Sequence, residues 1–255
     1  MNGYSRTVST LTSDNNRHKD VLGQFYNELT YDIPYNLWLD IIHHFQNKDQ
    51  SVLDIGCGTG NLTRQLDFKT KYGMDISQSM LEIACSHKDE INYFKADMKE
   101  FTLDRTFDMI VATVDVLNYL KDEDQFINTL KNVHDHMNDD GVFIFDIHSK
   151  YKMQNDFNNM LYTDDTEHVT YIWHALQGEA PLSAVHEMTY FVKNENDMYE
   201  RVDEEYTQRT YEHKDVIKMI EKAGLYLDTA FSDFDINHPV TTVCDRNFYI
   251  VKKAL

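Results

Sequence analysis

The spacing of apolar residues between residues 21 and 166 alternates between short strand-like runs and longer stretches with helical periodicity. Buried strands are predicted at 52–55, 71–76, 91–96, 107–111 and 141–147. Helices are predicted over 35–45, from Asn61, from Ser77 and over 122–137, where Phe126, Ile127, Leu130 and Val133 share one face. Alternation of strands with helices is typical of an α/β fold built on a parallel sheet.

The pattern changes between Glu167 and Tyr211, where apolar and polar residues alternate with a period of two. Turn-like breaks at 178–181 and 194–197 divide this segment, which predicts a three-stranded antiparallel unit inserted after the fifth strand. Helical spacing returns over 213–225, and 226–234 and 247–252 predict the last two strands of a seven-stranded sheet. The expected organisation is a disordered extension (1–20), an α/β domain (21–166), the antiparallel insert (167–211) and the C-terminal completion of the α/β domain (212–255).

The chemistry of the chain centres on the nine residues Val52–Gly60, where a buried strand ends in Asp54 and three glycines follow at alternate positions. A glycine loop between a strand and a helix places backbone N–H groups and a helix N-terminus beside a ligand. The dinucleotide fingerprint G-x-G-x-x-G needs a third glycine where Asn61 stands, and the P-loop pattern needs a lysine that the loop lacks.

The remaining pattern, Asp-x-Gly-x-Gly-x-Gly, resembles the first motif of class I S-adenosylmethionine-dependent methyltransferases. The resemblance implies a Rossmann-like, mostly parallel sheet with one antiparallel strand near its end, helices on both faces, and S-adenosylmethionine as cofactor. Asp75, at a strand end, is expected to bind the ribose hydroxyls, with a solvated turn as the alternative. By the same resemblance Asp97 and Met98 would contact the adenine, unless they form a surface turn. The full set expected to bind the cofactor is Asp54, Gly56, Cys57, Gly58, Gly60, Asp75, Ile76, Asp97, Met98 and Thr113.

Four shorter segments resemble, more narrowly, the YqeM-like family of bacterial methyltransferases. They are the Asp115–Leu120 segment, Tyr-Ile-Trp at 171–173, His-Glu-Met at 186–188 and Gln-Arg-Thr at 208–210. The resemblance covers residues 21–253, and the N-terminal extension carries none of these motifs. It does not identify the methyl acceptor, although related enzymes methylate small molecules beneath an antiparallel lid.

Composition narrows the choice of partners. The net charge of −19 and the lack of a basic stripe argue against nucleic acid as the main partner. Three scattered cysteines predict neither a zinc site nor a disulfide framework, so no metal is expected. Without a signal peptide or a long apolar run, the chain is expected to be cytoplasmic and not bound to a membrane. The sequence leaves the oligomeric state open.

Residues Thr113–Tyr119 follow the fourth strand and are expected to face the transferred methyl group, because ligands bind at the carboxyl ends of parallel strands. Asp115 would orient an amine or accept a proton, unless it only caps the next helix. His148 and His186 are candidate bases, although a lone histidine is more often structural. Arg209 would bind a substrate carboxylate or pair with a neighbouring glutamate. Further substrate-binding candidates are Tyr26, Tyr31, Tyr35 and Asn118, whereas Trp38 is expected to pack in the core.

These residues lead to the hypothesis of an enzyme that methylates nitrogen, or oxygen, of a small metabolite by in-line displacement. Alignment of the reacting groups supplies most of what such a reaction needs, about 7–11 kcal/mol. The alternatives are an S-adenosylmethionine-binding protein without transferase activity and, more weakly, an RNA methyltransferase.

Overall fold

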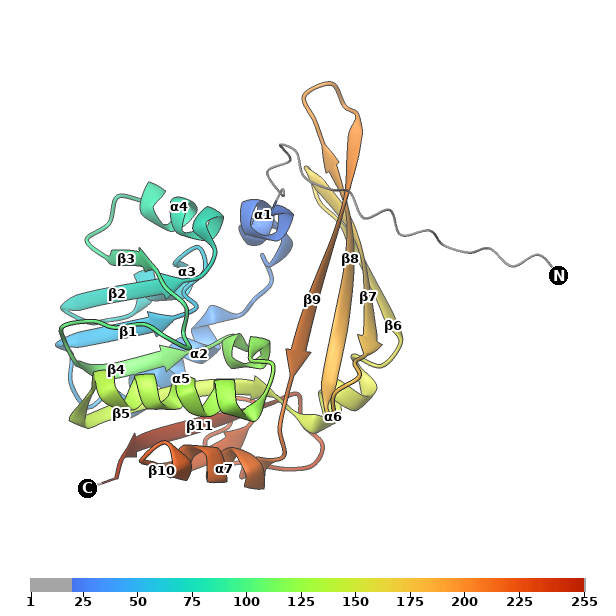
Figure 1. The fold of residues 1–255 in the computed structure, drawn as a ribbon. Coiled ribbons are helices and arrows are strands. Elements are labelled where there is room, and N and C mark those ends of the chain that lie inside the picture. Colours follow the sequence, from blue (N-terminus) through green and yellow to red (C-terminus); the bar gives the residue numbers. More distant parts are fainter. Residues whose placement is uncertain (1–19, 255) are drawn as a thin grey trace.

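The protein, seen here as a computed structural model that describes residues 20–254, contains two β-sheets, the smaller of which stands at the strand ends of the larger (Figure 1). The larger sheet has seven strands in the order β10-β11-β5-β4-β1-β2-β3. Their bounds are β1 (Ser51–Ile55), β2 (Thr70–Asp75), β3 (Asn92–Lys95), β4 (Phe107–Ala112), β5 (Met137–His148), β10 (Leu225–Ser232) and β11 (Arg246–Lys253). Only β11 runs antiparallel to its neighbours, which confirms the predicted α/β architecture.

Helices cover both faces of this sheet. The helical elements of the described chain, of which α1 and α6 pack against the second sheet, are α1 (Val21–Leu29), α2 (Tyr35–Phe45), α3 (Asn61–Gln65), α4 (Gln78–Ser86), the 3₁₀ turn η1 (Val116–Tyr119), α5 (Glu123–His136), α6 (Lys150–Asn155) and α7 (His213–Lys222). Successive side chains of a strand point to opposite faces, and β5 shows the result. Its Phe143 and Phe145 pack in the core under α5 and α7, whereas its Ile144 packs in the core under α2 and α3.

The second sheet, called the lid sheet below, is antiparallel and consists of β6 (Met160–Asp165), β7 (Val169–Gln177), β8 (Ser183–Lys193) and β9 (Tyr199–Arg209). It stands beside the carboxyl ends of the parallel strands, where the sequence predicted it (Figure 1). It has four strands, so the prediction of three strands beginning at Glu167 was wrong. The missed strand β6 is an outer edge strand whose Met160 and Leu161 are exposed, so it lacks the apolar alternation of a half-buried strand.

Helix α1 lies between the lid sheet and α4 (Figure 1). Its Val21 packs on Val169 and Tyr190 of the lid sheet, and its N-cap residue is Asp20, whose carboxylate accepts from Gly23 N at 2.7 Å. Asp20 was assigned to the disordered extension, and the structure corrects this by one residue. The rest of the predicted extension lies outside the described residues. Within residues 20–254, no helix combines the length and the apolar character needed to cross a membrane.

Candidate active site

The glycine loop joins β1 to α3 and is shaped by backbone conformations that favour glycine. Gly56 and Gly60 have φ values of 70° and 77°. A Cβ atom on Gly56 would lie 2.5 Å from the Val116 side chain, and one on Gly60 would lie 2.3 Å from the Tyr93 hydroxyl. The loop therefore packs too closely against the chain after β4 and against β3 to accept larger residues.

Acidic side chains surround the loop. The Asp75 carboxylate, at the end of β2, accepts hydrogen bonds from Gly58 N at 2.9 Å and Ser77 N at 2.8 Å. Asp54 accepts from Thr63 Oγ1 at 2.6 Å, and burial raises its pKa to about 7. Burial also raises the pKa of Asp75, with the backbone hydrogen bonds opposing that shift.

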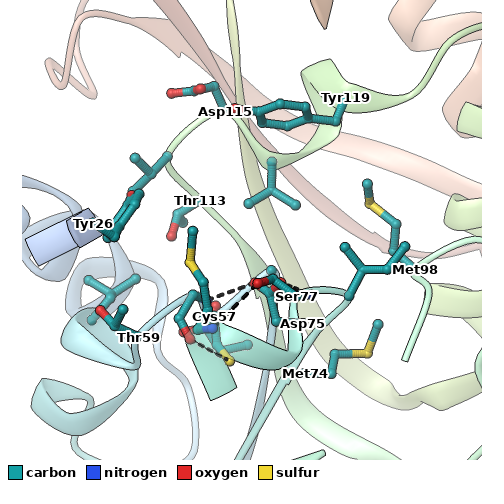
Figure 2. Close-up of a pocket in the computed structure, with 18 of the residues that line it drawn as sticks. Tyr26, Cys57, Thr59, Met74, Asp75, Ser77, Met98, Thr113, Asp115 and Tyr119 are labelled. Atoms are coloured by element: carbon teal, nitrogen blue, oxygen red, sulfur yellow. Dashed lines mark hydrogen bonds between the residues drawn. The ribbon is translucent and has the colours of Figure 1, made fainter. Parts of the chain in front are cut away.

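A cavity of about 700 Å³ extends from this loop to the lid sheet, and a volume of that size suits a small-molecule site. Most of the predicted residues line it: Tyr26, Tyr35, Asp54, Gly56, Cys57, Gly58, Asp75, Ile76, Asp97, Met98, Thr113 and Asp115. Gly60, Asn118, His148, His186 and Arg209 lie outside its lining, and Tyr31 is exposed at the surface. Figure 2 shows Tyr26, Thr113, Asp115 and Tyr119 around the same space as Cys57 and Asp75.

The loop after β4 places Asp115 in the cavity wall. Val114 and Asp115 both have left-handed φ values, 59° and 56°, and their N–H groups donate to the buried Asp146 carboxylate at 2.9 and 3.2 Å. Burial alone would raise the pKa of Asp115, but His148 and Arg246 beside the carboxylate hold that pKa well below its ordinary value. His148 Nε2 lies 3.4 Å and Arg246 Nη2 lies 3.6 Å from the Asp115 oxygens. Asp115 is therefore an ionised carboxylate and a poor proton acceptor.

The two candidate histidines lie behind Asp115 and not in the cavity wall. Burial lowers the pKa of His148, with Asp115 opposing that shift, and it lowers the pKa of His186 to about 4, so the His186 ring is neutral near pH 7. His186 has both ring nitrogens in hydrogen bonds, with Trp173 at 3.0 Å and Gln208 at 3.1 Å. A buried imidazole with no free nitrogen does not meet the geometry of a general base.

Asn118 and Arg209 serve the scaffold. The Asn118 side chain donates to Arg209 O at 2.8 Å and accepts from His148 N at 3.0 Å, so it joins η1 to β9 and β5. The Arg209 guanidinium donates to Lys121 O at 3.2 Å and lies 4.8 Å from the centre of the Tyr211 ring. These contacts place the Arg209 cation away from the cavity.

Five residues at the site were not named as candidates from the sequence, although Tyr119 lies in the Thr113–Tyr119 segment that was expected to face the methyl group. Asp20, Tyr119 and Tyr206 line the cavity, and Gln208 and Arg246 contact the Asp115 carboxylate. Tyr119 and Gln208 lie inside segments that had been singled out as motifs. The positions of Asp20 and Arg246 depend on contacts between residues far apart in the chain, which no local pattern indicates.

Charge distinguishes between possible cofactors. Asp20, Asp75 and Asp97 line the cavity near the glycine loop, as does Asp54, whose pKa of about 7 leaves it only partly charged at neutral pH. Their negative charges would repel the pyrophosphate of a dinucleotide, whereas they suit a ligand that carries a sulfonium and an ammonium group. The donor set therefore fits S-adenosylmethionine.

The geometry defines a class I methyltransferase fold with a site at the glycine loop. Comparison with known proteins agrees with this assignment. Residues 30–177 match the family model described as a methyltransferase domain. The chain belongs to this family of S-adenosylmethionine-dependent methyltransferases. Over 235 residues it is 33% identical to YqeM of Bacillus subtilis (strain 168), which is named as a methyltransferase. The match covers 90% of this chain and 94% of YqeM.

Two further relatives agree with this family assignment. The crystal structure of an S-adenosylmethionine-dependent methyltransferase from Clostridium acetobutylicum ATCC 824 superposes with a TM-score of 0.81 and 29% identity, covering 91% of this chain and 96% of that one. A dTDP-3-amino-3,6-dideoxy-alpha-D-glucopyranose N,N-dimethyltransferase of Streptomyces fradiae is 28% identical over 106 residues, 41% of this chain and 42% of that protein. The second match is partial and concerns less than half of either chain.

Proposed function

We propose that this protein methylates the nitrogen of a small amine-bearing metabolite. The observation that carries the proposal is the ionised Asp115 carboxylate in the cavity wall, with the hydroxyl-bearing rings of Tyr26, Tyr35, Tyr119 and Tyr206 lining the same cavity. S-adenosylmethionine supplies an electrophilic methyl group when bound. An amine that accepts this group becomes a cation, which Asp115 stabilises electrostatically.

The distribution of cations supports an amine over a carboxylate acceptor. Among the described residues that line the cavity, Lys99 is the one cation, and its Nζ lies 2.8 Å from the Asp97 carboxylate. Arg209, once the expected carboxylate ligand, binds Lys121 O instead. A substrate carboxylate would therefore meet Asp115 without a compensating positive charge, and a nucleic acid backbone would meet the same repulsion. The partial likeness to an amino-sugar N,N-dimethyltransferase agrees with this choice.

The residues at the site also determine where the proton of the amine goes before methyl transfer. Only the neutral form of an amine attacks an electrophile. Asp115 is not suited to remove its proton, and His148 and His186 both lie outside the cavity lining. The amine would therefore lose its proton to solvent before it attacks. Turnover is then expected to rise with pH until the bound amine is deprotonated. Cys57 offers no covalent alternative, because burial raises the pKa of its thiol far above the ordinary value.

The test is a transfer screen with methyl-labelled S-adenosylmethionine against small amines, including amino sugars, the matching alcohols and carboxylic acids, and total RNA. Labelling of an amine but not of its hydroxyl or carboxyl analogue is expected. Asp115→Asn should lower kcat about 10²-fold, the effect of losing one electrostatic stabiliser, with cofactor affinity nearly unchanged. Preferential labelling of a carboxylate or of RNA would refute the proposal. Tight cofactor binding without transfer to any acceptor would favour the non-catalytic alternative.

A further inference from the structure

Three side chains of the lid sheet form a continuous line of hydrogen bonds that ends on Asp115. Trp173 Nε1, on β7, lies 3.0 Å from His186 Nδ1, on β8. His186 Nε2 lies 3.1 Å from Gln208 Oε1, on β9, and Gln208 Nε2 lies 3.0 Å from Asp115 Oδ2. Each link crosses to another element, so the line runs from the middle of the lid sheet into the cavity wall.

Chemistry at the two ends fixes the direction of every bond in this line. An indole N–H only donates and an ionised carboxylate only accepts. His186 Nδ1 must therefore accept from Trp173, which leaves the imidazole proton on Nε2 to be donated to the carbonyl oxygen of Gln208. The Gln208 amide group then points at Asp115 as a donor. Neither the histidine tautomer nor the amide orientation is free to change without breaking a bond.

The surroundings of His186 keep it in this role. The ring is 5% exposed and packs edge-on against the Phe157 ring, with centroids 4.8 Å apart. Its neutral form is the one that the line requires, because a protonated ring could not accept from Trp173. His186 acts through Gln208 and does not itself reach the cavity.

We propose that Trp173, His186 and Gln208 are positioning residues, which hold one amide donor on Asp115 and so keep that carboxylate ionised and oriented toward the methyl acceptor. The part that concerns the acceptor rests on the function proposed above, whereas the hydrogen-bond line itself does not. In this role the lid sheet controls the ionisation and orientation of Asp115 in addition to covering the cavity.

Other groups also face Asp115 and stay in place when the line is altered. His148 from β5 and Arg246 from β11 lie beside its carboxylate, and the Tyr26 and Tyr119 hydroxyl groups act on it from α1 and η1. His148 is also the titratable neighbour that faces His186 besides Asp115. These groups are common to all variants, but Tyr119 also shares a hydrogen bond with Gln208, which Gln208→Leu removes and the His186 variants keep. A change in Asp115 titration shared by Gln208→Leu and His186→Phe therefore reports the line of hydrogen bonds.

The experiment compares four variants of the full chain. Gln208→Leu removes the donor, and His186→Phe leaves the Gln208 carbonyl without its partner. His186→Gln restores an N–H near the position of Nε2, and Tyr162→Phe is the matched control. Tyr162 packs on Trp173 with ring centroids 4.7 Å apart, and its hydroxyl donates to Asp156 O outside the line.

Nuclear magnetic resonance reports the outcome without any acceptor. In the wild-type protein at pH 7 the His186 nitrogen shifts should show the neutral Nε2–H tautomer. The chemical shift of the Asp115 carboxyl carbon should show an ionised carboxylate over the whole range in which His186 is neutral, above about pH 4. In Gln208→Leu the pKa of Asp115 should rise by about 1–2 units, the equivalent of one hydrogen bond to a charged group, so that its titration curve moves to higher pH. His186→Phe should shift it in the same direction, and His186→Gln and Tyr162→Phe should match the wild type.

Two results would overturn the proposal: an Nδ1–H tautomer for His186, or titration curves for Gln208→Leu that superimpose on those of the wild type. Once an acceptor is known, His186→Phe should lower kcat at unchanged cofactor affinity, and His186→Gln should recover most of it. Equal losses in both variants would indicate a structural role and would also overturn it. Failure of the amine screen would remove the proposed function and leave the titration result standing.

Discussion

The buried carboxylate of Asp146 is expected to be one of the most stabilising side chains of the protein. Asp146 is fully buried on β5 and accepts from Trp38 Nε1 at 2.8 Å and from the Val114 and Asp115 N–H groups at 2.9 and 3.2 Å. It also forms an ion pair with Arg246, whose guanidinium lies 4.8 Å from the centre of the Trp38 ring. One carboxylate therefore satisfies three N–H donors and one buried cation.

Asp146→Ala would leave all four of these groups without their acceptor. Removing one partner of a buried ion pair costs about 3–5 kcal/mol. Each orphaned donor adds about 1–3 kcal/mol, but these losses overlap because Arg246 keeps a second contact with Asp115. We expect a loss of about 3–5 kcal/mol, which is a large part of the roughly 5–15 kcal/mol that stabilises a typical domain.

Urea unfolding followed by circular dichroism measures this loss. With an m-value of about 3 kcal/mol/M, the midpoint should fall by roughly 1 M or more at unchanged m. Asp140→Ala is the matched control, because Asp140 pairs with Lys48 at the exposed surface and its removal should leave the midpoint unchanged. A midpoint for Asp146→Ala that coincides with that of the control would refute the reasoning.

Two more predictions concern the acidic residues at the glycine loop. Asp75→Ala should weaken S-adenosylmethionine binding in calorimetry by about 1–3 kcal/mol, the range for hydrogen bonds to a charged group, and unchanged affinity would contradict the role of Asp75. Because burial raises the pKa of Asp54 to about 7, folding binds a proton, and the associated stability is present below about pH 4 and is lost as pH rises toward 7. The free energy of unfolding should therefore fall more steeply over this range in the wild type than in Asp54→Asn, and parallel curves would contradict this.

The sequence predicts the helices and strands well because each of them depends on a local pattern of apolar and turn residues. The strand–glycine loop–helix unit, the helix over Tyr35–Phe45 and the seven strands of the main sheet follow from apolar spacing and from glycines at fixed offsets. The short edge strand β6 escaped because it buries almost nothing, and burial is what produces the pattern.

The site is harder to predict, because one residue of register decides which side chain reaches it. Along β9, Val202 and Tyr206 are partly buried, and a strict period of two from them leads to Gln208 and not to Arg209. Gln208 does contact Asp115, whereas Arg209 points to the other side and binds Lys121 O. The sequence left Arg209 as either a carboxylate ligand or the partner of a neighbouring glutamate, and the structure places it against Lys121 O. Applied strictly, the strand period selects Gln208 as the residue that reaches Asp115.

The loop after β4 shows why the remaining site residues need the structure. Two consecutive non-glycine residues, Val114 and Asp115, adopt left-handed backbone conformations, each of which costs of order 1–3 kcal/mol. Local propensity disfavours such a turn, and it persists because Asp146 accepts both of its N–H groups from a strand about thirty residues later in the chain. The result is that the Asp115 carboxylate is fixed between Gln208 and Arg246. A conformation that the local sequence opposes and distant contacts enforce is expected where function requires it, and here it determines the position of the residue proposed to stabilise the methylated amine.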